Sequence, residues 1–170
     1  PNTKGKTLVA DISSCFLSEP IDVSKFGILW GGVQKNVGPA GVAIVIIRED
    51  LITEDVLPGT PTMLRYKTYA DNDSLFNTPP TYTIYMCGKV FKWLKKMGGL
   101  EVMKERNEKK AKILYDFLDE SRLFRGTVEK KDRSLMNVPF VTGDEELDAL
   151  FVKEAKAAGF VNLKGHRTVG

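Results

Sequence analysis

A single lysine, Lys35, lies in a glycine-rich stretch that contains no other charge. The stretch is GGVQKNVGPAG, residues 31–41, and the apolar runs FGILW and GVAIVII flank it. A buried ammonium is unfavourable unless it is paired or neutralised. A lysine desolvated here would favour its neutral amine, a nucleophile whose usual chemistry is a Schiff base with a carbonyl group. The glycines would let backbone approach a bulky ligand closely.

An aspartate at the end of an earlier apolar run supplies a second reactive group. Asp11 lies at the carboxyl end of a buried strand predicted within KTLVADISS, residues 6–14. Pyridoxal-phosphate enzymes pair their lysine with an aspartate that faces the pyridine nitrogen of the cofactor. The cofactor phosphate needs hydroxyls, N–H groups or a helix N-terminus, and NTPP, residues 77–80, offers them. Together these groups suggest pyridoxal-phosphate chemistry.

Other chemistries fit the sequence less well. A P-loop needs Ser or Thr directly after its lysine, which this stretch lacks. The single histidine, His166, excludes a multi-histidine metal site, so no metal is expected, and no nucleophile elbow supports Ser-His-Asp hydrolysis. Cys15 and Cys87 fit no metal spacing and are interpreted as free thiols.

The composition is that of an ordinary globular protein. Charged residues make up 28% and the formal net charge is +3, so nucleic-acid binding through a basic surface is not expected. No stretch reaches the roughly 18 apolar residues of a membrane span, and no signal peptide is visible. We expect a cytoplasmic protein with no membrane partner.

The elements that must position these groups follow from the hydrophobic pattern. Strands are predicted from short apolar runs and helices from apolar residues at helical spacing. Predicted strands lie at 6–14, 26–32, 41–50 and 133–143, with a strand-like piece at 161–167, and predicted helices at 77–99, 100–121 and 144–159. The strand at 41–50 lacks alternation, which is typical of a strand covered on both faces.

The helix at 77–99 has a predicted start and a predicted apolar stripe. Thr78 is the expected N-cap, with Pro79 and Pro80 in the first turn. The stripe consists of Ile84, Met86, Cys87, Val90, Phe91 and Leu94.

Four stretches carry a resemblance to a known family. They are residues 9–51, LFNTPPTYTIYMCGKVFKWLKKMGG at 75–99, RSLMNVPF at 133–140 and LKGHRTVG at 163–170. They resemble the phosphoserine aminotransferases, which are fold-type I pyridoxal-phosphate enzymes, and the likeness covers nearly the whole chain. It implies an α/β fold: residues 1–105 would be part of a large cofactor-binding domain with a mixed, mostly parallel sheet. Residues 106–170 would be part of a small α/β C-terminal domain.

The resemblance also implies roles for individual residues. Lys35 would hold pyridoxal phosphate as a Schiff base and move the proton between the substrate Cα and the cofactor. Asp11 would pair with the pyridine nitrogen, and Gln34 would contact the cofactor phosphate. Asn77 and Thr78 would reach the phosphate of the neighbouring subunit's cofactor, which makes the site a product of a homodimer.

Two residues near the end of the chain would recognise the substrate. By the same resemblance, His166 and Arg167 would hold the substrate phosphate, across the dimer interface. The implied reaction is amino transfer between L-glutamate and 3-phosphohydroxypyruvate, giving O-phosphoserine and 2-oxoglutarate. It belongs to serine biosynthesis, and in some bacteria the family also serves pyridoxine biosynthesis.

Each assignment has an ordinary structural alternative. Lys35 could be a loop lysine that reaches water, and Asp11 a turn residue at a strand end. Asn77 and Thr78 could only cap a helix, and residues 166–167 could be a solvated strand edge.

The chain also departs from the family pattern. The family's chains are much longer, and the expected N-terminal half of the large domain is absent. With it would go the phosphate-binding loop and the aromatic residue that stacks on the cofactor. An arginine expected after the KGHR motif, for the substrate carboxylate, is also missing. We therefore expect a fragment with little or no transaminase activity alone.

Two other interpretations remain open. Another fold-type I enzyme, such as a serine–glyoxylate aminotransferase or a cysteine desulfurase, would keep Lys35 and Asp11. Such enzymes lack a dedicated clamp for a substrate phosphate, so His166 and Arg167 argue against them. A truncated lobe that serves as a dimerisation or interaction module is the non-enzymatic alternative.

Overall fold

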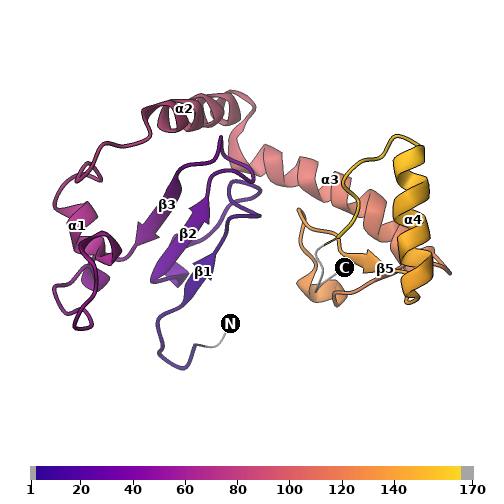
Figure 1. The fold of residues 1–170 in the computed structure, drawn as a ribbon, viewed down its shortest axis with the longest axis horizontal. Helices are drawn as coiled ribbons and strands as arrows, with labels where there is room; N and C mark the ends of the chain where they lie inside the picture. The colour runs from indigo at the N-terminus through magenta and orange to yellow at the C-terminus, as the bar shows by residue number, and fades with distance from the viewer. Residues whose placement is uncertain (1–2, 166–170) are drawn as a thin grey trace. The chain divides into compact units, whose positions relative to one another are not determined.

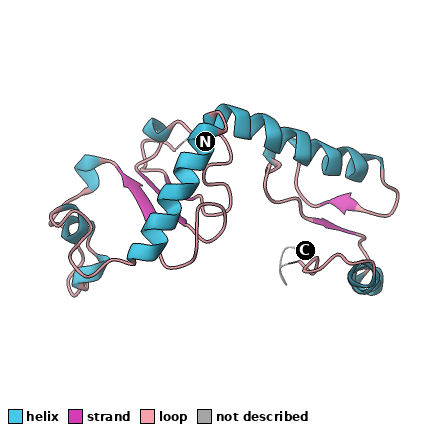
Figure 2. Cartoon of the chain, turned by 90° about the horizontal axis from the view of Figure 1, so that it is seen from above, coloured by secondary structure: helices cyan, strands magenta, loops and turns pink. Residues whose placement is uncertain are grey.

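The computed structural model describes residues 3–165 and divides the chain into two compact units (Figure 1). The first unit runs to Met103 and the second begins at Lys104, inside a long helix. Each unit has its own small sheet (Figure 2). No helix among the described residues is both long and apolar enough to cross a membrane.

The sheet of the first unit has three strands in the order β1-β2-β3. They are β1 Val9–Asp11, β2 Ile28–Gly32 and β3 Ala43–Ile47, each inside a predicted strand. β1 and β2 run parallel, with Asp11 opposite Trp30, whereas β2 and β3 are antiparallel. The fold is therefore α/β with a mixed sheet, as predicted. Because β1 and β2 are parallel, their carboxyl ends meet at one edge of the sheet.

β3 does not match its prediction as a strand covered on both faces. Val45 is 40% exposed and Ile46 is 41% exposed. Successive side chains of a strand point to opposite faces of the sheet. Neither face of β3 is therefore fully covered by the described residues.

Helix α2, Thr81–Lys96, begins two residues later than the predicted N-cap implies. Its N-cap is Pro80, which makes no side-chain capping hydrogen bond, so Thr78 is not the N-cap. The prediction was wrong because a residue that precedes a proline is disfavoured in the α conformation. An N-cap at Thr78 would require Pro79 to be helical, but Pro79 precedes Pro80, so the chain becomes helical only after the second proline.

The inward face of α2 also differs from the predicted stripe. Thr83, Cys87 and Leu94 are its buried residues, whereas Ile84 is 48% exposed and Phe91 41% exposed. Thr83 was missed because it is polar. Its hydroxyl can be buried because it donates a hydrogen bond to a backbone carbonyl of the loop that carries the lysine.

Short helical elements connect these parts of the first unit. They are η1 Val23–Lys25, η2 Glu49–Leu51, η3 Thr62–Leu64 and α1 Tyr66–Ala70.

The second unit is built around the long helix α3, Gly99–Glu120. The elements that follow it are β4 Arg125–Gly126, η4 Lys130–Asp132, β5 Phe140–Val141 and α4 Glu145–Ala157. The strand predicted at 133–143 is reduced to β5, because its antiparallel partner β4 has only two residues. The described part of the strand-like piece, residues 161–165, forms no strand.

A cluster of four phenylalanines forms the aromatic core of the second unit. Phe124 lies at its centre, with ring centroids 5.2 Å from Phe151, 5.5 Å from Phe140 and 6.2 Å from Phe117. The first two contacts are edge-to-face, a geometry that the ring quadrupoles favour. The cluster joins α3, α4 and β5.

An arginine anchors the loop between β4 and β5 to α3. Arg133 Nη1 donates to Asp119 Oδ2 at 3.0 Å, and the guanidinium lies 4.5 Å from the ring centroid of Tyr115. The Tyr115 hydroxyl donates to the carbonyl of Ser134 at 2.9 Å. Hydrogen bonds from Arg133 and then from Lys130 hold the pKa of Asp119 well below its ordinary value.

Candidate active site

The glycine-rich stretch, residues 31–41 and called here the Lys35 loop, begins at the end of β2. Val37 N donates to Val33 O at 2.9 Å, which closes a helical turn around Lys35. Val33 and Val37 are 0% and 1% exposed and pack against Cys87 of α2. With both valines facing inward, the turn between them faces outward.

Lys35 is consequently exposed rather than desolvated. The prediction of a buried amine was wrong for this structure, because the apolar residues around Lys35 pack against one another and against α2. The lysine side chain is therefore available to a ligand at the carboxyl edge of the sheet.

Asp11 is the last residue of β1 and is held by the turn that follows it. Its Oδ1 accepts hydrogen bonds from the backbone N–H of Ser13 at 2.8 Å and from the Ser13 hydroxyl at 2.6 Å. The Ser13 Oγ in turn accepts from the backbone N–H of Gly32, the last residue of β2, at 2.9 Å. One serine thus links the carboxyl ends of the two parallel strands.

Lys35 lies close enough to Asp11 for its charge to act on the carboxylate. The hydrogen bonds from Ser13 are the main reason that the pKa of Asp11 lies below its ordinary value, and the positive charge of Lys35 lowers it further. An ionised carboxylate and an amine that are 24 positions apart in the sequence therefore lie near each other in the fold.

Gln34 shares this edge of the sheet. Its side chain folds back over the end of β2, and a Cβ atom added to Gly32 would lie only 2.6 Å from Gln34 Oε1. Gln34 is itself exposed.

Two glycines of the Lys35 loop, Gly31 and Gly38, lie in close contact with other parts of the protein, where a larger residue would not fit. A Cβ added to Gly38 would lie 2.8 Å from the Cys87 sulfur, and one added to Gly31 would lie 3.0 Å from the Phe16 ring. Gly41 has a positive φ of 122°, which other residues rarely adopt. The space that the sequence assigned to a ligand is, at Gly31 and Gly38, occupied by protein atoms.

Two further hydrogen bonds, which the sequence did not indicate, hold the Lys35 loop. The Asn36 side-chain amide donates to the carbonyl of Phe16 at 2.8 Å, and the Thr83 hydroxyl of α2 donates to the carbonyl of Ala40 at 3.2 Å. Asn36 and Thr83 are ordinary polar residues whose partners are distant in sequence. No local pattern identifies them. Ser13 has a signal, because a serine two residues after an aspartate commonly closes a turn.

Two of the remaining predicted residues, Asn77 and Thr78, lie within the described part of the chain. Asn77 and Thr78 are exposed and precede α2, where the Asn77 amide donates to the Thr78 carbonyl at 3.3 Å. Within residues 3–165, no hydrogen bond or ion pair joins either of them to Asp11, Gln34 or Lys35. His166 and Arg167 lie outside the described residues.

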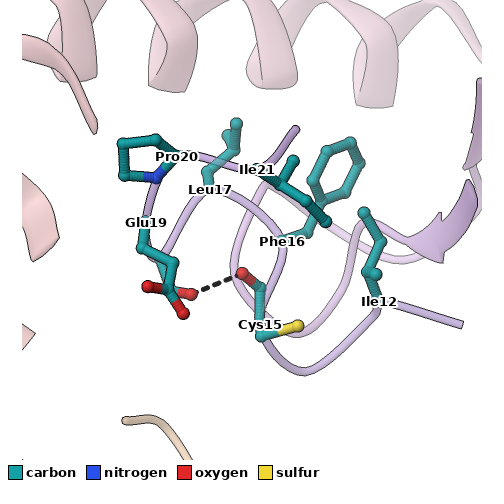
Figure 3. Close-up of a pocket in the computed structure, with 8 residues that line it drawn as sticks. Ile12, Cys15, Phe16, Leu17, Glu19, Pro20 and Ile21 are labelled. Carbon is teal, nitrogen blue, oxygen red and sulfur yellow. Dashed lines mark hydrogen bonds between the residues drawn. The ribbon is translucent and has the colours of Figure 1, made fainter. Parts of the chain in front are cut away.

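A small cavity of about 90 Å³ lies beside Asp11, lined by Ile12 and residues 15–21 (Figure 3). The Ser18 hydroxyl closes its wall by donating to the Cys15 carbonyl at 2.6 Å, the dashed line in Figure 3. Burial raises the pKa of the Cys15 thiol, so this cysteine is not an activated nucleophile. The cavity is lined mainly by apolar side chains.

The exposed pair fits one cofactor chemically. Lys35 supplies a primary amine, which condenses with an aldehyde, and Asp11 supplies an anion suited to a protonated ring nitrogen. Among the described residues, no group of three or more His, Cys, Asp or Glu side chains could hold a metal ion. Pyridoxal phosphate carries both an aldehyde and a pyridine nitrogen, so the donor set matches it.

The comparisons with known proteins agree with this chemistry. The family model of the class-V aminotransferases matches residues 2–169. The chain belongs to the class-V aminotransferase family. Within it, the chain is 56% identical over 169 residues to the phosphoserine aminotransferase of Nitrosomonas europaea. That alignment covers 99% of this chain but 46% of the relative, so the chain spans about half the length of the curated relatives it matches.

Solved structures give the same result. The phosphoserine aminotransferase of Bacillus circulans subsp. alkalophilus superposes with a TM-score of 0.91 at 49% identity, over 100% of this chain and 47% of that one. A PLP-bound phosphoserine aminotransferase from Trichomonas vaginalis superposes with a TM-score of 0.90 at 38% identity, over 98% of this chain and 48% of that one.

Proposed function

We propose that this chain is part of a phosphoserine aminotransferase and carries the catalytic lysine of its pyridoxal-phosphate site. The reaction would be amino transfer between L-glutamate and 3-phosphohydroxypyruvate, giving O-phosphoserine and 2-oxoglutarate in serine biosynthesis. The likeness to the Nitrosomonas europaea and Bacillus circulans enzymes supports this substrate assignment. A cytoplasmic homodimer, with pyridoxine biosynthesis as a second pathway role, is part of the proposal.

The single observation that carries the proposal is the placement of Asp11 and Lys35. They lie at neighbouring strand ends, on the edge where α/β sheets bind ligands, and the charge of Lys35 acts on Asp11. When bound there, pyridoxal phosphate supplies an electron sink for amino-acid chemistry. Asp11 would keep the ring nitrogen protonated, and Lys35 Nζ would hold the cofactor and move a proton to and from the substrate Cα.

The other residues have binding roles in this proposal. Gln34, beside the strand end, would contact the cofactor phosphate. Asn77 and Thr78 would reach the phosphate in the partner subunit, and His166 and Arg167 would bind the substrate phosphate. Arginine suits a phosphate because its planar guanidinium is always charged and can bind two oxygens. Residues 1–105 would then belong to the cofactor-binding domain and residues 106–170 to the small domain.

Borohydride reduction tests the proposal directly. The full-length protein is mixed with pyridoxal phosphate, reduced and digested, and the peptides are mapped by mass spectrometry. We expect a phosphopyridoxyl group on Lys35. K35A should lose this adduct and at least about 100-fold of the transaminase activity, because the proton-transfer group is gone.

An exposed lysine from the same unit provides the matched control. Lys25, at the end of η1, is paired with Asp22 at 3.5 Å and lies outside the Lys35 loop. K25A should keep both the adduct on Lys35 and the activity. An adduct spread over several lysines, or unchanged activity in K35A, would refute the proposed site.

A further inference from the structure

Ser13 has a bonding pattern that a simple turn serine does not need. The chain contains a second Asp-x-Ser turn, in which Asp22 Oδ1 accepts from the Ser24 N–H at 3.2 Å and from its hydroxyl at 2.6 Å. Ser13 makes the same two bonds to Asp11, but its Oγ also accepts the N–H of Gly32, 19 residues away. The local turn is shared by both serines, whereas the link between strands belongs to Ser13.

The direction of these hydrogen bonds is fixed by chemistry. A backbone N–H can only donate, so Gly32 uses a lone pair of Ser13 Oγ. The hydroxyl hydrogen is then free to point to Asp11, and the 2.6 Å separation is typical of an O–H donor on an ionised carboxylate. Both donors of Ser13 use Oδ1. Within residues 3–165, Oδ2 of Asp11 accepts no hydrogen bond, so this oxygen is open to a ligand.

We propose that Ser13 is a positioning residue, which holds Oδ1 of Asp11 so that Oδ2 faces the ring nitrogen of the cofactor. This inference rests on the proposed function. The hydrogen bond to Gly32 matters because Gly32 ends β2 and belongs to the Lys35 loop. Because Ser13 bonds to both Asp11 and that strand end, it holds the Asp11 carboxylate in a fixed position relative to the loop that carries Lys35. The charged or ionisable side chains that act on the Asp11 carboxylate, or that it acts on, are Lys35 and the Cys15 thiol.

A pair of non-covalent probes separates positioning from a general structural role. The first probe is pyridoxamine 5′-phosphate, and the second is its 1-deaza analogue, in which carbon replaces the ring nitrogen. Dissociation constants of both are measured by fluorescence with the full-length protein. The dissociation constant of the 1-deaza analogue divided by that of pyridoxamine 5′-phosphate reports only the interaction at the ring nitrogen, because every other contact is common to both probes.

We expect S13A to reduce this ratio about tenfold, by weakening the first probe and leaving the second unchanged. S13T keeps a hydroxyl on Cβ and should restore the ratio. Two matched controls should behave as wild type. S24A removes the equivalent bond from the other Asp-x-Ser turn, and S14A alters the neighbouring serine, whose hydroxyl makes no hydrogen bond within residues 3–165.

The outcomes are distinct for the two proposals. If S13A weakens both probes equally, or neither, Ser13 does not position Asp11 and the inference fails while the cofactor site stands. If the wild-type protein binds neither probe, or binds both equally well, Asp11 makes no contact with a ring nitrogen. In that case the proposed function falls, and the inference falls with it.

Discussion

Asp11 and Asp119 both have a lowered pKa, for different reasons and with different consequences. Neutral donors from Ser13 stabilise the Asp11 carboxylate, and Lys35 adds a smaller effect. Two cations, Arg133 and Lys130, stabilise Asp119. A lowered pKa alone therefore does not mark a functional site. Asp11 is distinguished by its place at a strand end and by an oxygen that stays open to a ligand.

Because of Asp119, the stability of the second unit should decrease at acidic pH. Its folded pKa lies below the ordinary value of 3.8, so its stabilising effect is complete above that value and is lost as the pH falls below it. We expect the urea midpoint of wild type to decrease between about pH 4.5 and about pH 2.5 and D119N to decrease less over the same interval. D119N should also be less stable at pH 7, because Arg133, only 13% exposed, loses its anionic partner.

The matched control is the aspartate one turn earlier in α3. Asp116 pairs with Lys112 at 2.7 Å, but both side chains are exposed, so D116N should change the midpoint little at either pH. Equal acid sensitivity of D119N and wild type would show that the Arg133 pair is not responsible.

Between elements, the contact of the Lys35 loop with α2 depends on Gly38. Its backbone lies so close to Cys87 that a Cβ there would be 2.8 Å from the sulfur. G38A should therefore destabilise the protein by about 1–3 kcal/mol through overpacking. G88A, on the same helix and with no atom within 4 Å of the added Cβ, should be neutral or stabilising by up to about 1 kcal/mol. Thermal unfolding of both variants provides the comparison.

A second substitution identifies the cause. C87A removes the sulfur that the new methyl group would meet, so G38A should cost less in the C87A background than in wild type. Equal costs in both backgrounds would mean that the strain lies in the backbone of the loop and not against α2.

The strands and the main helices were predictable from the sequence because their signals are local. Apolar runs predicted β1, β2 and β3, and apolar residues at helical spacing predicted α4. In the structure, the N-cap of α4 is Asp144, which accepts from two N–H groups. The start of α2 was predicted too early because Pro79, which precedes Pro80, does not adopt the helical conformation that an N-cap at Thr78 requires. β5 was overestimated because strand length depends on a partner strand, which is not a local property.

The candidate site was partly predictable for the same reason. Lys35 and Asp11 were found from their unusual surroundings and from the family resemblance, and the structure brings them together. The exposure of Lys35 matches the alternative of a loop lysine that reaches water, and it arises because Val33 and Val37 both pack inward. Ser13 and Asn36 act through backbone groups of distant residues, and sequence contains no direct signal for such bonds.

At the scale of the whole molecule, the chain holds only part of the chemistry that the proposed reaction needs. Asp11, Gln34 and Lys35 lie at the same edge of the sheet, whereas no hydrogen bond or ion pair within residues 3–165 joins Asn77 or Thr78 to them. The chain also spans 46% of the Nitrosomonas europaea relative. Both facts are compatible with a site to which other chain segments and a partner subunit contribute.

Mixing inactive variants of the full-length protein tests whether Asn77 and Thr78 act across a dimer. K35A and the double variant N77A/T78A are each expected to be inactive, since each lacks a group in both sites. After subunit exchange, half of the dimers are mixed, and each mixed dimer regains one intact site if the two residues reach the partner's cofactor. We therefore expect about a quarter of wild-type activity in an equal mixture. K35A mixed with D11A should stay inactive, because Lys35 and Asp11 belong to the same subunit's site. If the first mixture also stays inactive while mass spectrometry shows mixed dimers, Asn77 and Thr78 act within their own subunit, and the shared site is excluded.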